Sequence, residues 1–85
     1  MDEPLELAIA AIKAELVLAR KNYGAFNSAH EGWAVIYEEM RELETEVFKN
    51  PQKRSNQAMR DEAIQVAAMA IRFVLEVCVV RNNTI

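Results

Sequence analysis

The sequence contains little of what small proteins use to build turns, sheets or cross-links. Its 85 residues include only 2 Gly, 2 Pro, 1 Cys and 1 His, and aromatic residues make up 7%. So few turn-forming and aromatic residues argue against an all-β fold. The single cysteine, Cys78, excludes an internal disulfide and a zinc site built on several cysteines. With 2 Gly and 1 His, neither a Gly-rich phosphate loop nor a Ser-His-Asp arrangement can be assembled.

The sequence also lacks an excess of positive charge and a long apolar run. Lysine and arginine number 10 against 13 acidic residues, which gives a net charge of -3 and argues against a nucleic-acid-binding protein. Lys13, Glu15, Arg72 and Glu76 interrupt the most apolar stretches, so none approaches the roughly 18 residues of a membrane span. The acidic first residues are unlike a secretory signal. We therefore expect a single cytoplasmic domain, with no membrane and no nucleic acid among its partners.

Helical periodicity predicts an all-α fold. Apolar residues recur every three or four positions in three stretches, separated by short polar breaks. The predicted helices cover about residues 4–23, 28–49 and 55–81. Ser28 followed by Glu31 has the spacing of a capping box, and Ser55 or Asn56 is suited to cap the third helix. Pro51 lies in the loop between the second and third helices, because proline disfavours helix at the preceding residue.

The three predicted helices carry more apolar surface than one small core can bury. The first helix has an apolar stripe that is widened on both sides by further apolar residues, and a helix of this kind usually has more than one neighbour. The third helix is apolar on nearly every side between Ala63 and Val80. Chains of about this length rarely obtain enough stability from their own core. We therefore predict a three-helix protomer that forms an oligomeric helical bundle, most simply a two-fold dimer. Cys78 is expected to be a buried small apolar residue. Met40, Met59 and Met69 are expected to fill the core or an interface.

Carboxylates gather on one side of the second predicted helix. Glu39, Glu42 and Glu46 fall within about 60° of one another at 100° per residue. Neighbouring carboxylates at this spacing repel one another, so a cation is a natural partner. If the second and third helices pack antiparallel, Glu39 and Glu42 face Glu62 and Gln65. Three carboxylates and one amide oxygen form the all-oxygen ligand set that Mg²⁺ or Mn²⁺ prefers. A solvated acidic helix face is the alternative interpretation.

The order of these residues resembles the signature of a known enzyme family. Glu38-Glu39-x-x-Glu42, followed after about twenty residues by Glu62-x-x-Gln65, is similar to the Glu-Glu-x-x-Glu…Glu-x-x-Asp signature of MazG-like nucleoside triphosphate pyrophosphohydrolases. The segments 30–34 and 62–70 also resemble short MazG-like proteins of phages and bacteria. The resemblance covers about residues 28 to 76.

The resemblance implies a fold, an activity and a set of roles. It implies an all-α homodimer or homotetramer that cleaves a nucleotide substrate between its α and β phosphates, with magnesium, to release a monophosphate and pyrophosphate. Glu39, Glu42 and Glu62 would be metal ligands, with Gln65 as a fourth. Glu38 would support a ligand or act as the base that activates the attacking water.

Gln65 departs from the family signature, which has Asp at this position. The amide oxygen can still coordinate a hard cation, but the site loses one negative charge. An alternative function is therefore a non-enzymatic helical module with a weakened site, which acts through oligomerisation or partner binding.

Three residues apart from the candidate metal ligands are candidates for substrate binding. Lys53 and Arg54, in the loop between the acidic helices, are placed to hold triphosphate oxygens, although loop residues of this type often serve only solubility. Trp33 is a candidate for a base pocket, although its place at the edge of the core stripe also fits packing.

Overall fold

Residues 2–79 fold into three α-helices, the last of which continues into a π-helical segment. The computed structural model describes residues 2–79, and the elements in order are α1 (Glu3–Asn22), α2 (Ala29–Val47), α3 (Asn56–Phe73) and η1 (Val74–Val79). Residues 2–79 contain no strand, so the all-α prediction is confirmed over this range. The third predicted helix is continuous from residue 56 to 79, but its last turns are π-helical. Its predicted end at residue 81 lies outside the described residues.

Short polar side chains begin each helix, as the sequence indicated. The Ser28 hydroxyl accepts a hydrogen bond from the backbone N–H of Glu31 at 3.0 Å. The Glu31 carboxylate in turn accepts the backbone N–H of Asn27 at 2.7 Å, one residue before the cap. Asp2 and Ser55 cap α1 and α3 in the same way. Each cap satisfies an amide that would otherwise have no partner within the helix.

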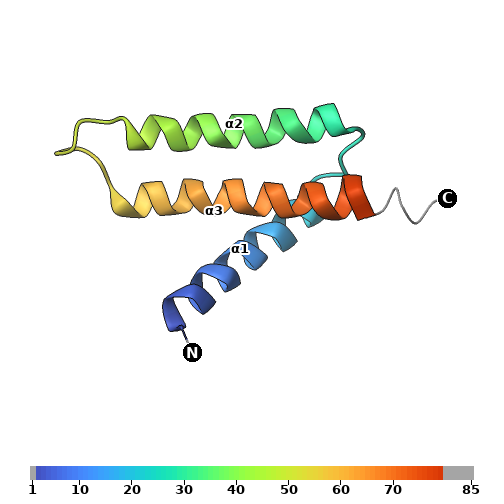
Figure 1. Cartoon of the computed structure of the whole chain (residues 1–85), viewed down its shortest axis with the longest axis horizontal. Coiled ribbons are helices and arrows are strands. Elements are labelled where there is room, and N and C mark those ends of the chain that lie inside the picture. The colour runs from blue at the N-terminus through green and yellow to red at the C-terminus, as the bar shows by residue number, and fades with distance from the viewer. Residues whose placement is uncertain (1, 80–85) are drawn as a thin grey trace.

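Helices α2 and α3 form an antiparallel hairpin, and α1 packs mainly against α3 (Figure 1). A glycine allows α2 to approach α3 closely near the open end of the hairpin. A Cβ atom added to Gly32 would lie 2.6 Å from the ring of Phe73 and 3.1 Å from the ring of Phe26. The far end of α1 points away from the hairpin, with its first residues well separated from α2 and α3 (Figure 1).

The core of the single protomer is small. Its buried apolar residues are Phe26, Ile64, Ala68, Met69 and Val77. Helix α1 contributes no buried residue, and large apolar side chains along it remain more than half exposed. Much apolar surface thus remains uncovered in the single protomer. The oligomeric state stays a prediction.

One expectation about packing is not met. Cys78 was expected to be buried, but it is exposed, because Glu76 and Val77 occupy the inward side of η1 and the next residue faces out. Met40 is 47% exposed on α2, whereas Met69 is in the core. Within residues 2–79, every helix is too short or too polar to span a lipid bilayer.

Candidate functional site

The fold brings three carboxylates from two helices together. One carboxylate oxygen of each of Glu39, Glu42 and Glu62 lies within 4.8 Å of the other two. Glu39 and Glu42 are one turn apart on α2, and the antiparallel course of α3 places Glu62 opposite them. These three residues are called the acidic cluster below. Glu39 and Glu62 are half-buried at the helix contact, while Glu42 is exposed.

Glu39 is difficult to ionise in this position. Burial between the helices raises the pKa of its carboxyl from the usual 4.5 to about 7, and the charges of Glu42 and Glu62 act in the same direction. Partial loss of hydration disfavours the charged form of an acid, and nearby like charges add to this effect. Near neutral pH, Glu39 therefore holds its proton for a substantial part of the time.

Glu62 is perturbed in the same direction. Loss of hydration raises the pKa of its carboxyl, and the charges of Glu42, Glu46 and Asp61 raise it further. Glu46 is itself paired with Lys49, whose Nζ lies 2.9 Å from its carboxylate. The negative charge of the acidic cluster is therefore only partly compensated. A bound cation would reduce the repulsion between its carboxylates.

A cleft begins beside the acidic cluster and runs along the junction of α1, α2 and α3. Its volume is about 720 Å³, within the range of small-molecule sites. Glu39 belongs both to the cluster and to the cleft wall. The wall also includes, from the three helices, Glu15, Leu18, Glu38, Gln65, Met69 and Arg72. The segment 23–27 between α1 and α2 closes the other end.

Glu38 and Gln65, the other two residues expected at the metal site, also line this cleft. Gln65 is half-buried on α3, one turn after Glu62. Glu38 is exposed beside Glu39. Asp61 is directed elsewhere, because its carboxylate accepts a hydrogen bond from the Gln57 amide at 2.8 Å. The structure therefore gathers all five predicted site residues in one region.

The three candidates for substrate binding do not line the cleft. Lys53 and Arg54 are exposed in the loop, where the Arg54 guanidinium donates a hydrogen bond to the Val47 carbonyl at 3.0 Å. Arg54 thus satisfies the end of α2. Trp33 is 61% exposed and stacks on Tyr37, with ring centroids 6.0 Å apart, so the expected packing in the core does not occur within the protomer. Their roles in substrate binding stay predictions.

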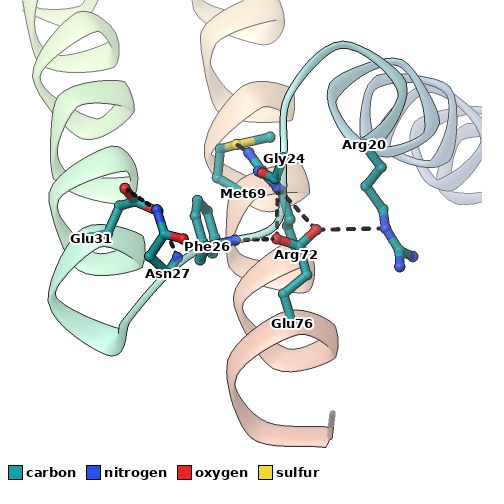
Figure 2. A network of polar contacts seen from close by, with 8 residues as sticks. All are labelled: Arg20, Gly24, Phe26, Asn27, Glu31, Met69, Arg72 and Glu76. Atoms are coloured by element: carbon teal, nitrogen blue, oxygen red, sulfur yellow. Dashed lines mark hydrogen bonds and ion pairs between the residues drawn. The ribbon is translucent and has the colours of Figure 1, made fainter. Parts of the chain in front are cut away.

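The opposite end of the cleft is built around a buried ion pair that sequence reasoning missed. Arg72 and Glu76 are 4% and 7% exposed, and the Arg72 Nε lies 3.0 Å from the Glu76 carboxylate. The segment 23–27, called the linker below, crosses this pair (Figure 2). The Phe26 backbone N–H donates a hydrogen bond to the Glu76 carboxylate at 2.9 Å, and the Arg72 guanidinium donates one to the Gly24 carbonyl. The Arg72 guanidinium also lies over the Phe26 ring, 4.1 Å from its centroid.

This ion pair fixes the linker against the last turns of the third helix. A weaker contact ties in α1, because Arg20 lies 3.5 Å from Glu76, although the Arg20 side chain is half-exposed (Figure 2). The available signal was the i,i+4 spacing of Arg72 and Glu76 inside an apolar stretch, where two charges need partners. In the sequence alone, these two charges stand out only as interruptions of that stretch.

Comparisons of the chain with family models, with curated proteins and with solved structures give no match. The site is therefore defined by its own residues: an acidic cluster on two antiparallel helices at the end of a cleft.

Proposed function

We propose that this protein is a metal-dependent nucleoside triphosphate pyrophosphohydrolase, which converts a nucleoside triphosphate to a monophosphate and pyrophosphate. The observation that carries the proposal is the acidic cluster at the end of a cleft large enough for a nucleotide. The order of the same glutamates along the chain, which resembles the MazG-like signature, supplies the reaction class.

The donor set fits Mg²⁺ or Mn²⁺. Magnesium binds oxygen at about 2.0–2.1 Å, so two oxygens on opposite sides of one ion are about 4.2 Å apart. The 4.8 Å limit within the acidic cluster is close enough for small side-chain rotations to bring the three oxygens onto one ion. Glu39, Glu42 and Glu62 would hold the cation, and Gln65 would offer its amide oxygen. When bound, the cation would neutralise phosphate oxygens and lower the pKa of a coordinated water.

Glu38 is suited to accept a proton during hydrolysis. Its carboxylate is exposed to solvent and lines the cleft next to Glu39, so it can take a proton from a water molecule there. The homodimer or homotetramer expected from the sequence is part of the proposal, since the cleft lies beside α1, whose apolar surface is largely uncovered.

The experiment that tests this function measures pyrophosphate release from a panel of nucleoside triphosphates, with and without Mg²⁺. We expect release that depends on metal and is lost in Glu42→Gln, which removes an exposed cluster carboxylate without opening a cavity. Glu44→Gln is the matched control, because Glu44 is an exposed glutamate of the same helix outside the acidic cluster. The absence of release from every nucleotide, with Mg²⁺ or Mn²⁺, would exclude the proposed activity.

The second candidate function is a non-enzymatic helical module with a weakened metal site. Gln65 favours it, because a neutral amide lines the cleft where the resemblance leads one to expect a carboxylate. We expect Gln65→Asp to strengthen Mg²⁺ binding and any pyrophosphate release. Without metal, the added charge beside Glu62 should lower the melting temperature slightly. Calorimetric titration with Mg²⁺ and thermal unfolding check both signs; unchanged values in both would place residue 65 outside the metal site.

A further inference from the structure

Helix α1 has two stripes of residues, one that contacts the rest of the protomer and a second that faces away from it. The residues of α1 that are half-buried are 8, 11, 12, 15, 16 and 19. At 100° per residue, these six point in one general direction, toward α3. The second stripe lies about 150° around the helix from them and consists of Glu3, Leu7, Ala10, Ala14, Val17 and Lys21. All six of its residues are exposed, Leu7 by 60% and Val17 by 61%.

The spacing of this stripe is that of a helix-pairing seam. Its residues alternate steps of four and three positions, which is the heptad repeat of helices that pack along their length. The two alanines at its centre let a second helix approach closely, since the distance between helix axes depends on the side chains at the contact. The stripe is separate from the cleft wall, which takes its α1 residues from Glu15, Leu18, Ala19 and Asn22.

The order of large and small residues along the stripe is the same from either end, and the two ends carry opposite charges. From the N-terminal end it runs acidic, large apolar, small, small, large apolar and basic. Two copies laid antiparallel would therefore pair Leu7 with the partner's Val17 and Ala10 with the partner's Ala14. Glu3 would lie beside the partner's Lys21, twice in each dimer. A two-fold contact requires this kind of self-complementary surface, in which each pairing occurs twice.

We propose that α1 pairs antiparallel with α1 of a second copy through this stripe, forming a two-fold homodimer. Acidic first turns and basic last turns are common in helices. Here they flank the symmetric order Leu7, Ala10, Ala14 and Val17, which a second copy matches position by position, and this argues for a second copy as the occupant. Glu6, on one flank of the stripe, would lie near the partner's Arg20, which also keeps its 3.5 Å contact with Glu76 of its own chain. Lys13 lies on that flank near the two-fold axis, where it faces its own copy as an unfavourable, solvent-screened contact.

A matched pair of substitutions tests which face of α1 is used. Leu7 and Leu5 are both exposed leucines of the first two turns, by 60% and 54%, but only Leu7 belongs to the stripe. We expect the native chain to have twice its 9.7 kDa mass by light scattering at micromolar concentration. Leu7→Glu should weaken dimerisation at least ten-fold, and Leu5→Glu should leave it unchanged. Helix content by circular dichroism should be retained in both variants.

Charge exchange tests the antiparallel orientation. Glu3→Lys alone places two lysines together at each end of the dimer, and Lys21→Glu alone places two glutamates there. Each variant should dimerise more weakly than the native chain. Mixing the two variants restores both attractive pairs. Heterodimers should therefore outnumber the two homodimers together several-fold in native mass spectrometry, whereas random pairing gives equal numbers of the two kinds.

The proposal is overturned by any of three results. The native chain could be a monomer throughout the micromolar range. Leu7→Glu could dimerise as tightly as Leu5→Glu, which would move the interface to another surface. The mixed charge variants could pair at random, which would exclude the antiparallel arrangement. None of these measurements involves nucleotide, so the outcome is independent of the proposed hydrolase activity.

Discussion

At the scale of single residues, Glu39 lies where partial burial and neighbouring carboxylates oppose its ionisation. Its pKa is raised to about 7, whereas the unfolded chain has the ordinary value near 4.5. Between these two values the folded state binds more protons than the unfolded state. The free energy of unfolding therefore falls as the pH rises through this window. The raised pKa of Glu62 acts in the same direction.

We expect Glu39→Gln to remove much of this pH dependence. Without metal, the variant should melt higher than the native chain at pH 8, because it lacks the unfavourable charge. At pH 5, where Glu39 is protonated, the two should melt at nearly the same temperature. Thermal unfolding followed by circular dichroism between pH 5 and 8 measures the difference, with Glu44→Gln as control. Parallel pH profiles for the native chain and Glu39→Gln would contradict the assigned perturbation.

The Arg72–Glu76 pair is the second feature decided by single residues. Glu76→Gln keeps an oxygen that can accept the Phe26 N–H, but it leaves the buried Arg72 charge without its counter-ion. Breaking a buried pair in this way typically costs about 3–5 kcal/mol of unfolding free energy. Urea unfolding of Glu76→Gln should show a loss of this size.

The double variant Arg72→Met/Glu76→Gln should lose less than Glu76→Gln alone, because no unpaired charge is left buried. A loss below about 1 kcal/mol in Glu76→Gln would mean that Arg72 reaches water in solution.

At the scale of helices, the contact between α2 and α3 depends on a residue without a side chain. We expect Gly32→Ala to destabilise the protein by about 1–2 kcal/mol, although alanine favours helix more than glycine. The new methyl group would overlap the Phe73 ring and press on Phe26, and the rings must move to make room for it. Urea unfolding measures the change, and Gly24→Ala is the control, because a Cβ at Gly24 meets no neighbouring atom. Stabilisation by Gly32→Ala would show that the rings yield freely.

The helices themselves could be predicted because their signals are local. Apolar spacing and caps such as Ser28 and Ser55 depend on residues within a few positions, so the predicted and observed starts agree within one residue. The change to a π-helix at Val74 is different, because apolar spacing predicts a helix but does not distinguish α-helical from π-helical hydrogen bonding.

The acidic cluster could be predicted only in part. Its two α2 members follow from helix geometry, and Glu62 follows once an antiparallel hairpin is assumed. The distance of Lys53 and Trp33 from the cleft could not be predicted, since it depends on the course of the loop and on which face of α2 is covered. The pairing of Arg72 with Glu76 had a local signal in their spacing, but the burial of Arg72 also requires the segment 23–27 to cross it, which no local pattern indicates.

At the scale of the whole molecule, the small core gives the proposed dimer a direct influence on stability. The protomer buries few apolar residues, and α1 contacts the hairpin along only one face. If two copies associate and the unfolded chain does not, dimerisation favours the folded state by mass action. The melting temperature of such a protein depends on its concentration, unlike that of a monomer.

We therefore expect the melting temperature to rise by several degrees when the protein concentration is raised from about 1 to 100 µM. Mass action over this range contributes about 2.7 kcal/mol per dimer, shared between two chains, and about 1 kcal/mol shifts the midpoint of a domain this small by roughly 4–8 °C. Leu7→Glu should abolish the concentration dependence, while Leu5→Glu retains it. Scanning calorimetry in metal-free buffer makes the measurement, so that cation binding at the acidic cluster does not contribute. A melting temperature that is constant over this range would mean that the protein stays monomeric and that the α1 stripe remains exposed to solvent.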